Sequence, residues 1–130
     1  MSELIHKEVS FAIRGAVYTV YKTLGCSFKE SVYHKALIEE LHVKGLQLED
    51  EKRIAITYKG KNVGTYVPDI VVNEKVILEL KAKPFLTKGD KEQFWHYLKG
   101  SNYKLGFLIN FGKPGGVELV RWVYDTARNK

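Results

Sequence analysis

Apolar residues recur at helical spacing in two segments near the start of the chain. Residues 3–23 form the first segment, and Gly25 is a residue type that commonly ends a helix. A second helix is expected over residues 28–44, ending before Gly45. The apolar positions that define the two helices are Ile5, Val9, Ala12, Ile13, Ala16, Val17 and Val20, then Val32, Ala36, Leu37, Leu41 and Val43.

Beyond Gly45 the pattern changes to β-branched and alternating runs, which are typical of strands. Residues 90–99 are an exception, because their spacing is helical and Gly100 follows them. The run at 103–111 is the most apolar and is expected to be central in the sheet. The strands predicted are 46–58, 63–72, 76–81, 103–111 and 117–124. The order α-α-β-β-β-α-β-β indicates an α/β (α+β) fold in which helices flank a sheet.

The segment from Pro68 to Lys81 places charged residues on apolar strands. If residues 73–75 form a three-residue loop, Asp69 lies opposite Glu79, and the two share a face with Lys81. A two-residue loop would separate the carboxylates and mix both faces. Opposed carboxylates repel each other unless a cation lies between them. The favoured register leaves the other face wholly apolar, with Ile70, Val72, Val76, Leu78 and Leu80.

Size and charge narrow the class of protein. The chain has 130 residues, enough for a single domain over residues 1–130, and a net charge of +6 that favours an anionic partner, nucleic acid first. With Cys26 as its one cysteine, the chain has no internal disulfide. No apolar run is long enough to cross a membrane and no signal peptide is evident, so we expect a cytoplasmic protein.

An Asp on one strand and a Glu-x-Lys on the next suit metal-assisted hydrolysis of a phosphodiester. Carboxylates are the ligands that Mg²⁺ prefers, and a lysine on the same face can orient the attacking water and neutralise the transition state. The alternative is a surface Glu–Lys pair on an edge strand.

These residues resemble the motif of the PD-(D/E)XK nuclease superfamily, with Pro68-Asp69 as the PD and Glu79-Leu80-Lys81 as the ExK. The resemblance implies a restriction-endonuclease-like fold, with a mixed sheet, and the Leu80 carbonyl as a further metal ligand. Gln93 and Tyr97 lie one helical turn apart and resemble the Gln-x-x-x-Tyr motif of the RecB-like exonuclease branch. That motif implies that Gln93 contacts the lysine or substrate and Tyr97 the DNA backbone. The alternative is an ordinary amphipathic helix with Phe94 and Leu98 in the core.

Residues 25–33 resemble the signature of the small bacterial GxxExxY proteins, predicted members of the same superfamily. The similarity continues in order through most of the chain, at Ala36-Leu37, Tyr58-Lys59-Gly60, Glu79-Leu80-Lys81-Ala82, Gln93, Tyr97-Leu98-Lys99 and 108–112. It implies that Glu30 is an extra carboxylate directed at the metal. Ser27 replaces the first glycine of the signature, and Ser27-x-x-Glu30 is also the pattern of a capping box. Tyr33 either lines the same cleft or is a packing tyrosine.

The sequence therefore predicts a Mg²⁺-dependent deoxyribonuclease, with Mn²⁺ as an alternative metal, acting on DNA rather than RNA in DNA processing or repair. The main alternative is an inactive nucleic-acid-binding or homodimeric interaction module on the same fold. The candidate metal ligands are Asp69, Glu79, Leu80 and Glu30; the catalytic candidates are Asp69, Glu79, Lys81 and Gln93; and the substrate-binding candidates are Tyr97, Tyr33, Lys83 and Lys99.

Overall fold

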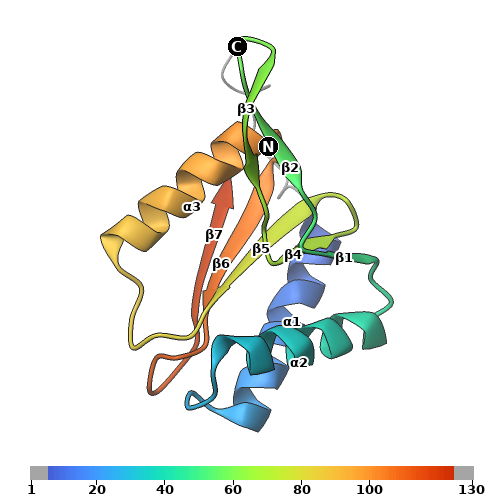
Figure 1. Ribbon diagram of the computed structural model, residues 1–130. Helices are drawn as coiled ribbons and strands as arrows, with labels where there is room; N and C mark the ends of the chain where they lie inside the picture. The colour runs from blue at the N-terminus through green and yellow to red at the C-terminus, as the bar shows by residue number, and fades with distance from the viewer. Residues whose placement is uncertain (1–5, 125–130) are drawn as a thin grey trace, which may run out of the picture.

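The structure is a computed structural model of the chain, and it describes residues 6–124. Helices cover both faces of a mixed sheet, which confirms the predicted fold class (Figure 1). No helix within the described residues combines the length and apolarity needed to cross a lipid bilayer. The elements in chain order are α1 (Lys7–Leu24), α2 (Glu30–Val43), β1 (Leu48–Asp50), β2 (Ile54–Tyr58), β3 (Lys61–Tyr66), β4 (Ile70–Val72), β5 (Val76–Lys81), α3 (Lys88–Ser101), β6 (Leu105–Asn110) and β7 (Glu118–Val123).

The main sheet has the strand order β1-β4-β5-β6-β7. Strands β5 and β6 are parallel and are connected by α3, whereas the other neighbours are antiparallel. The mixed sheet agrees with the restriction-endonuclease-like arrangement. The strand predicted at 103–111 corresponds to β6, an interior strand between β5 and β7 whose six residues are all buried, and β5 is the middle strand of the sheet.

Two of the predicted strands are each divided in the structure, so five strands and not three lie between α2 and α3. The run 46–58 forms β1 and β2, because Glu51 between them takes a left-handed backbone conformation with φ 53°. The run 63–72 forms β3 and β4, separated at Pro68, which has no N–H for a ladder. As a result β2 and β3 leave the main sheet and pair as a separate two-stranded ribbon.

The β4–β5 hairpin has the predicted register. Ile70 pairs with Leu78 and Val72 with Val76, which leaves residues 73–75 as the loop. Asn73 at the start of this loop has φ 51°, a conformation that asparagine tolerates, and its Oδ1 accepts a hydrogen bond of 2.8 Å from the Gln47 N–H. The polar turn therefore fixes which residues of β5 face each layer.

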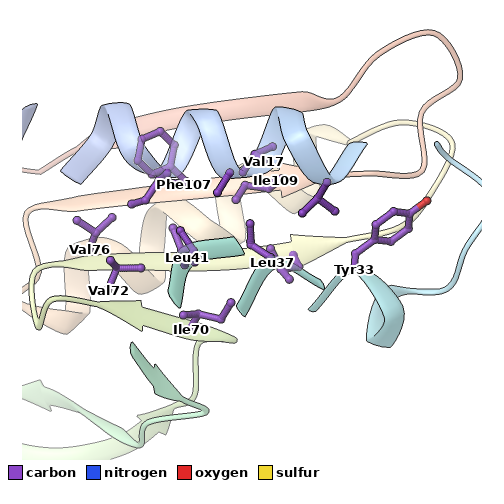
Figure 2. Packing of buried hydrophobic residues seen from close by; sticks show 14 of the residues in the cluster. Val17, Tyr33, Leu37, Leu41, Ile70, Val72, Val76, Phe107 and Ile109 are labelled. Carbon is purple, nitrogen blue, oxygen red and sulfur yellow. The ribbon is translucent and has the colours of Figure 1, made fainter. Parts of the chain in front are cut away.

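Each face of the sheet has its own hydrophobic core. On one face α1 and α2 pack against alternate residues of β4, β5 and β6, as Figure 2 shows for Leu37, Ile70 and Phe107. On the other face Phe94 and Leu98 of α3 pack with Ile77 and the base of the ribbon. All five residues predicted to form the apolar face of the hairpin lie in the first core. Strand alternation then directs Glu79 and Lys81 toward α3 and the ribbon.

Candidate active site

The two carboxylates predicted from the hairpin are held side by side where β4 and β5 part. Asp69 precedes β4, and its Oδ2 accepts a hydrogen bond of 2.7 Å from the Leu80 N–H. Glu79 lies in β5, and its Oε1 accepts a hydrogen bond of 3.0 Å from the Tyr66 hydroxyl. These contacts tie the carboxylates to rigid strands.

Burial disfavours ionisation of both groups, and the charge of Asp69 adds to this effect at Glu79. Desolvation is the main cause that raises the pKa of Glu79, to about 7, and the charge of Asp69 raises it further. The pKa of Asp69 is also raised, mainly by desolvation. Lys81 acts in the opposite direction and lowers the pKa of both carboxyl groups. The pair is thus a partly buried acidic site with one adjacent lysine.

A small pocket joins these residues to α3. Gln93 and Tyr97, which share a helix face, line the pocket together with Glu79 and Lys81, as the spacing predicts. The Tyr97 ring stacks on Tyr66, with centroids 4.3 Å apart and planes at 7°. The helix is also amphipathic, since its buried residues include Phe94 and Leu98. The pocket is lined by Tyr66, Glu79, Lys81, Asp90, Gln93, Phe94, Tyr97 and Leu108.

Glu30 is the first residue of α2 and does not form a capping box with Ser27. The N-cap is Lys29, which makes no side-chain cap hydrogen bond, so the capping-box interpretation is wrong at this position. The capping box of this fold lies instead at Thr87 and Asp90, at the start of α3. Glu30 is exposed, yet partial desolvation and then the charge of Asp69 raise its pKa. Its carboxylate therefore adds to the field of the acidic site.

The metal-ligand set expected from the sequence is met only in part. Within residues 6–124, no three His, Cys, Asp or Glu side chains lie close enough to hold one metal ion, so Glu30 does not complete a three-carboxylate set. Asp69 and Glu79 nevertheless supply hard oxygen donors, which suit a divalent cation such as Mg²⁺. Burial is the main cause that raises the pKa of both carboxyl groups, and a bound cation would offset this cost of keeping them ionised. The donors present fit a cation held by the pair.

The substrate-binding candidates lie in different surroundings. Tyr33 is fully buried, stacks on Phe111 and donates a hydrogen bond to the Gly25 carbonyl. We therefore assign Tyr33 to the core, which corrects the expectation that it contacts substrate. The Lys83 ammonium pairs with Asp90 at 2.7 Å, at the edge of the pocket, whereas Lys99 is exposed on α3.

Three residues near the site were not singled out from the sequence. Tyr66 comes from the separate ribbon, so no local pattern connects it with Glu79. His34, the second of these residues, has its Nε2 2.7 Å from Asp50 Oδ1. The charge of His34 also lowers the pKa of Glu30 and Asp69. Glu30 and His34 are four residues apart on α2, which is the signal that could have connected them.

Asn110, the third of these residues, joins the ends of the two parallel strands. It is fully buried at the end of β6, opposite Lys81. Its Oδ1 accepts hydrogen bonds from the N–H groups of Lys83 and Gly112, and its Nδ2 donates to the Lys83 carbonyl and Glu118. A Cβ on Gly112 would lie 2.3 Å from the Lys83 nitrogen, so only glycine permits this approach. In the sequence, the one indication of this role is that Asn110 is a polar residue at the end of an apolar strand.

The raised pKa of Glu79 predicts a pH-dependent stability in metal-free buffer. A carboxyl whose pKa rises on folding stabilises the protein below its unfolded pKa, and that contribution is lost as pH rises through the folded value. The free energy of unfolding should therefore fall between about pH 4.5 and 7. Glu79→Gln should remove this loss, stabilising the protein at pH 8.5 by up to about 3 kcal/mol. Urea unfolding of both proteins at pH 4.5 and 8.5 measures this difference in stability. A pH dependence of the variant equal to that of the wild type would contradict the prediction.

One comparison with known proteins identifies a family for this chain. Residues 7–122 match the family model of the PD-(D/E)XK nuclease superfamily. No curated protein and no solved structure matches the chain. The matched segment contains both carboxylates, the lysine and the α3 residues of the pocket. Because the match spans most of the 130 residues, the chain belongs to the PD-(D/E)XK nuclease superfamily.

Proposed function

We propose that this protein is a metal-dependent nuclease that hydrolyses phosphodiester bonds in DNA, with a role in DNA processing or repair. One observation carries the proposal: Glu79 and Lys81 project from β5 into one pocket, beside Asp69 and the Gln93 face of α3. Superfamily membership supports nuclease chemistry in general. The net charge of +6 favours a polyanionic substrate.

Asp69, Glu79 and the Leu80 carbonyl are the residues that would hold a Mg²⁺ ion, and Mn²⁺ should serve as a substitute. Such an ion supplies a polarised water and compensates the negative charge that develops on the phosphate. We assign Glu30 an electrostatic part and not that of a third direct ligand, because the charge of Asp69 adds to desolvation in raising the pKa of Glu30, and no three acidic, His or Cys side chains within residues 6–124 could hold one metal ion.

Lys81 is the proposed catalytic lysine, because it is the cation beside both carboxylates and shares their face of the sheet. Its ammonium can orient the attacking water and stabilise the transition-state charge. Gln93 would support Lys81 or the substrate across the pocket, and Tyr97 would contact the DNA backbone. Lys83 is a weaker candidate for substrate binding, because its ammonium already pairs with Asp90.

The direct test is a cleavage assay with purified protein on single- and double-stranded DNA. Mg²⁺ or Mn²⁺ should produce cleavage that excess EDTA abolishes, because two adjacent carboxylates need a cation to bind a phosphate nearby. RNA of matched length serves as the comparison substrate. Salt-sensitive DNA binding without cleavage under any of these metals would favour the inactive binding module. A stable dimer that binds no nucleic acid would favour the interaction protein.

A further inference from the structure

The β2–β3 ribbon is a slender element that extends away from the main sheet. In Figure 1 it rises beside the end of α3, and its turn lies at the top of the view, beyond the ends of β6 and β7. The turn has two residues, Lys59 and Gly60, with φ of 50° and 81°, the conformation of a tight hairpin. A register shift at Ile56 marks a bulge, which increases the local twist.

The far half of this ribbon is basic and exposed. Residues 54–68 contain two lysines, Lys59 and Lys61, and no acidic residue. Both lysines are exposed, and the side chains of Tyr58 and Val63 beside them are each 61% exposed. Together these side chains give the far half of the ribbon both cationic and apolar contact groups. They suit a surface that meets phosphates and bases together.

The near half of the ribbon is anchored at the candidate active site. Tyr66 at the end of β3 donates its hydroxyl to Glu79 and stacks on Tyr97. Farther along, Ile56 lies against Gly100 of α3, next to the exposed Lys99. The five residue steps from Tyr66 to Lys61 span about 17 Å at the strand rise. The turn is therefore about five base pairs from the carboxylates when measured along B-form DNA.

We propose that this ribbon enters the major groove of double-stranded DNA and makes a duplex the preferred substrate, an inference that rests on the proposed nuclease function. The major groove of B-DNA admits a two-stranded ribbon. In contrast, the deep, narrow major groove of A-form RNA excludes one. Lys59 and Lys61 bind backbone phosphates on the groove walls, and Tyr58 and Val63 contact the groove floor. The anchor at Tyr66 places the bound duplex across the pocket.

Equilibrium binding in EDTA, where no cleavage occurs, isolates the contribution of the ribbon. The variant Lys59→Gln/Lys61→Gln should weaken binding to a duplex of about 20 base pairs about tenfold or more at 0.1 M salt. The slope of log K against log salt should become shallower by about 2, because two phosphate contacts are lost. Binding to a single strand of the same length should fall much less, since a single strand has no groove.

The matched control is Lys7→Gln/Lys75→Gln, which removes the same charge from exposed positions on α1 and on the turn preceding β5. It should leave the slope within about 0.5 of wild type, because no groove contact is lost. Equal slopes for the two double variants would overturn the ribbon proposal while wild-type cleavage still supported the nuclease. If Lys59→Gln/Lys61→Gln selectively lost duplex binding but the wild-type protein cleaved no DNA, the nuclease proposal would be overturned and the proposed role of the ribbon would stand. Equal losses on duplex and single strand would exclude groove insertion.

Discussion

Lys81→Ala is expected to reduce the rate of metal-dependent DNA cleavage by about 10³-fold while changing DNA affinity by less than about threefold. The lysine lines the pocket with Glu79, and its charge lowers the pKa of both carboxyl groups, so its loss removes a positive charge from the place where the phosphate would react. Single-turnover cleavage under saturating Mg²⁺ measures the chemical step directly. Affinity is measured separately in EDTA.

A matched control for this variant lies two residues farther along the chain. Lys83→Ala removes the same charge, but from an ammonium that pairs with Asp90. We expect it to reduce cleavage by less than about tenfold, because Lys83 does not line the pocket and its partly exposed ion pair contributes little energy. A Lys81→Ala protein that cuts DNA at the wild-type rate would remove Lys81 from the mechanism. Equal losses in both variants would assign the effect to general electrostatics.

Asn110→Ala should have the largest effect on stability, a loss of about 3–5 kcal/mol in the free energy of unfolding. The fully buried side chain makes four hydrogen bonds, and its truncation leaves the Lys83 backbone without partners inside the protein. Urea unfolding with the m-value checked measures this loss. The exposed Asn62 makes a single side-chain hydrogen bond, to the Gly64 N–H, so Asn62→Ala should cost less than about 1 kcal/mol.

Asn110→Ala also tests whether the position of Lys81 depends on the Asn110 hydrogen bonds. Lys81 is paired with Asn110 across β5 and β6, so a loosened strand end should displace the lysine. Cleavage by Asn110→Ala should therefore fall under conditions where the protein is still fully folded. A variant as stable as wild type would show that the Asn110 hydrogen bonds are readily replaced by water. A destabilised but fully active variant would show that Lys81 does not depend on this junction.

The hairpin was predictable because its information is local. Alternation between Ile70 and Lys81 fixes one register, and only that register gives an unbroken apolar face, so the contact between Asp69 and β5 followed from the sequence. Local pattern misled the prediction where a strand changes sheet. The run from 63 to 72 is rich in β-branched residues, which are typical of one strand, but Pro68 ends one pairing and the next strand starts in another sheet.

The features of the site that could not be predicted from the sequence depend on tertiary packing. Tyr66 contacts Glu79 from the ribbon, whose two strands were predicted as parts of longer strands. No sequence pattern therefore indicated this contact. Ser27 and Glu30 fit a capping box by type and spacing, yet the N-cap of the helix is Lys29, and desolvation followed by the charge of Asp69 raises the pKa of Glu30. Tyr33 fitted a motif that suggested a cleft, although its ring stacks on Phe111 within the core. Residue type and spacing do not show which layer a side chain enters.

The position of β5 has a consequence for how the site can move. Strands β4 and β6 border β5 on its two sides, and the Lys81 carbonyl accepts a further hydrogen bond from the Phe111 N–H. Local opening of a central strand requires nearly global unfolding, whereas a two-stranded ribbon can fluctuate at much lower cost. The side chains of Glu79 and Lys81 on β5 should therefore keep their positions, and the ribbon is the part of the site that can change its conformation to fit DNA of different shapes.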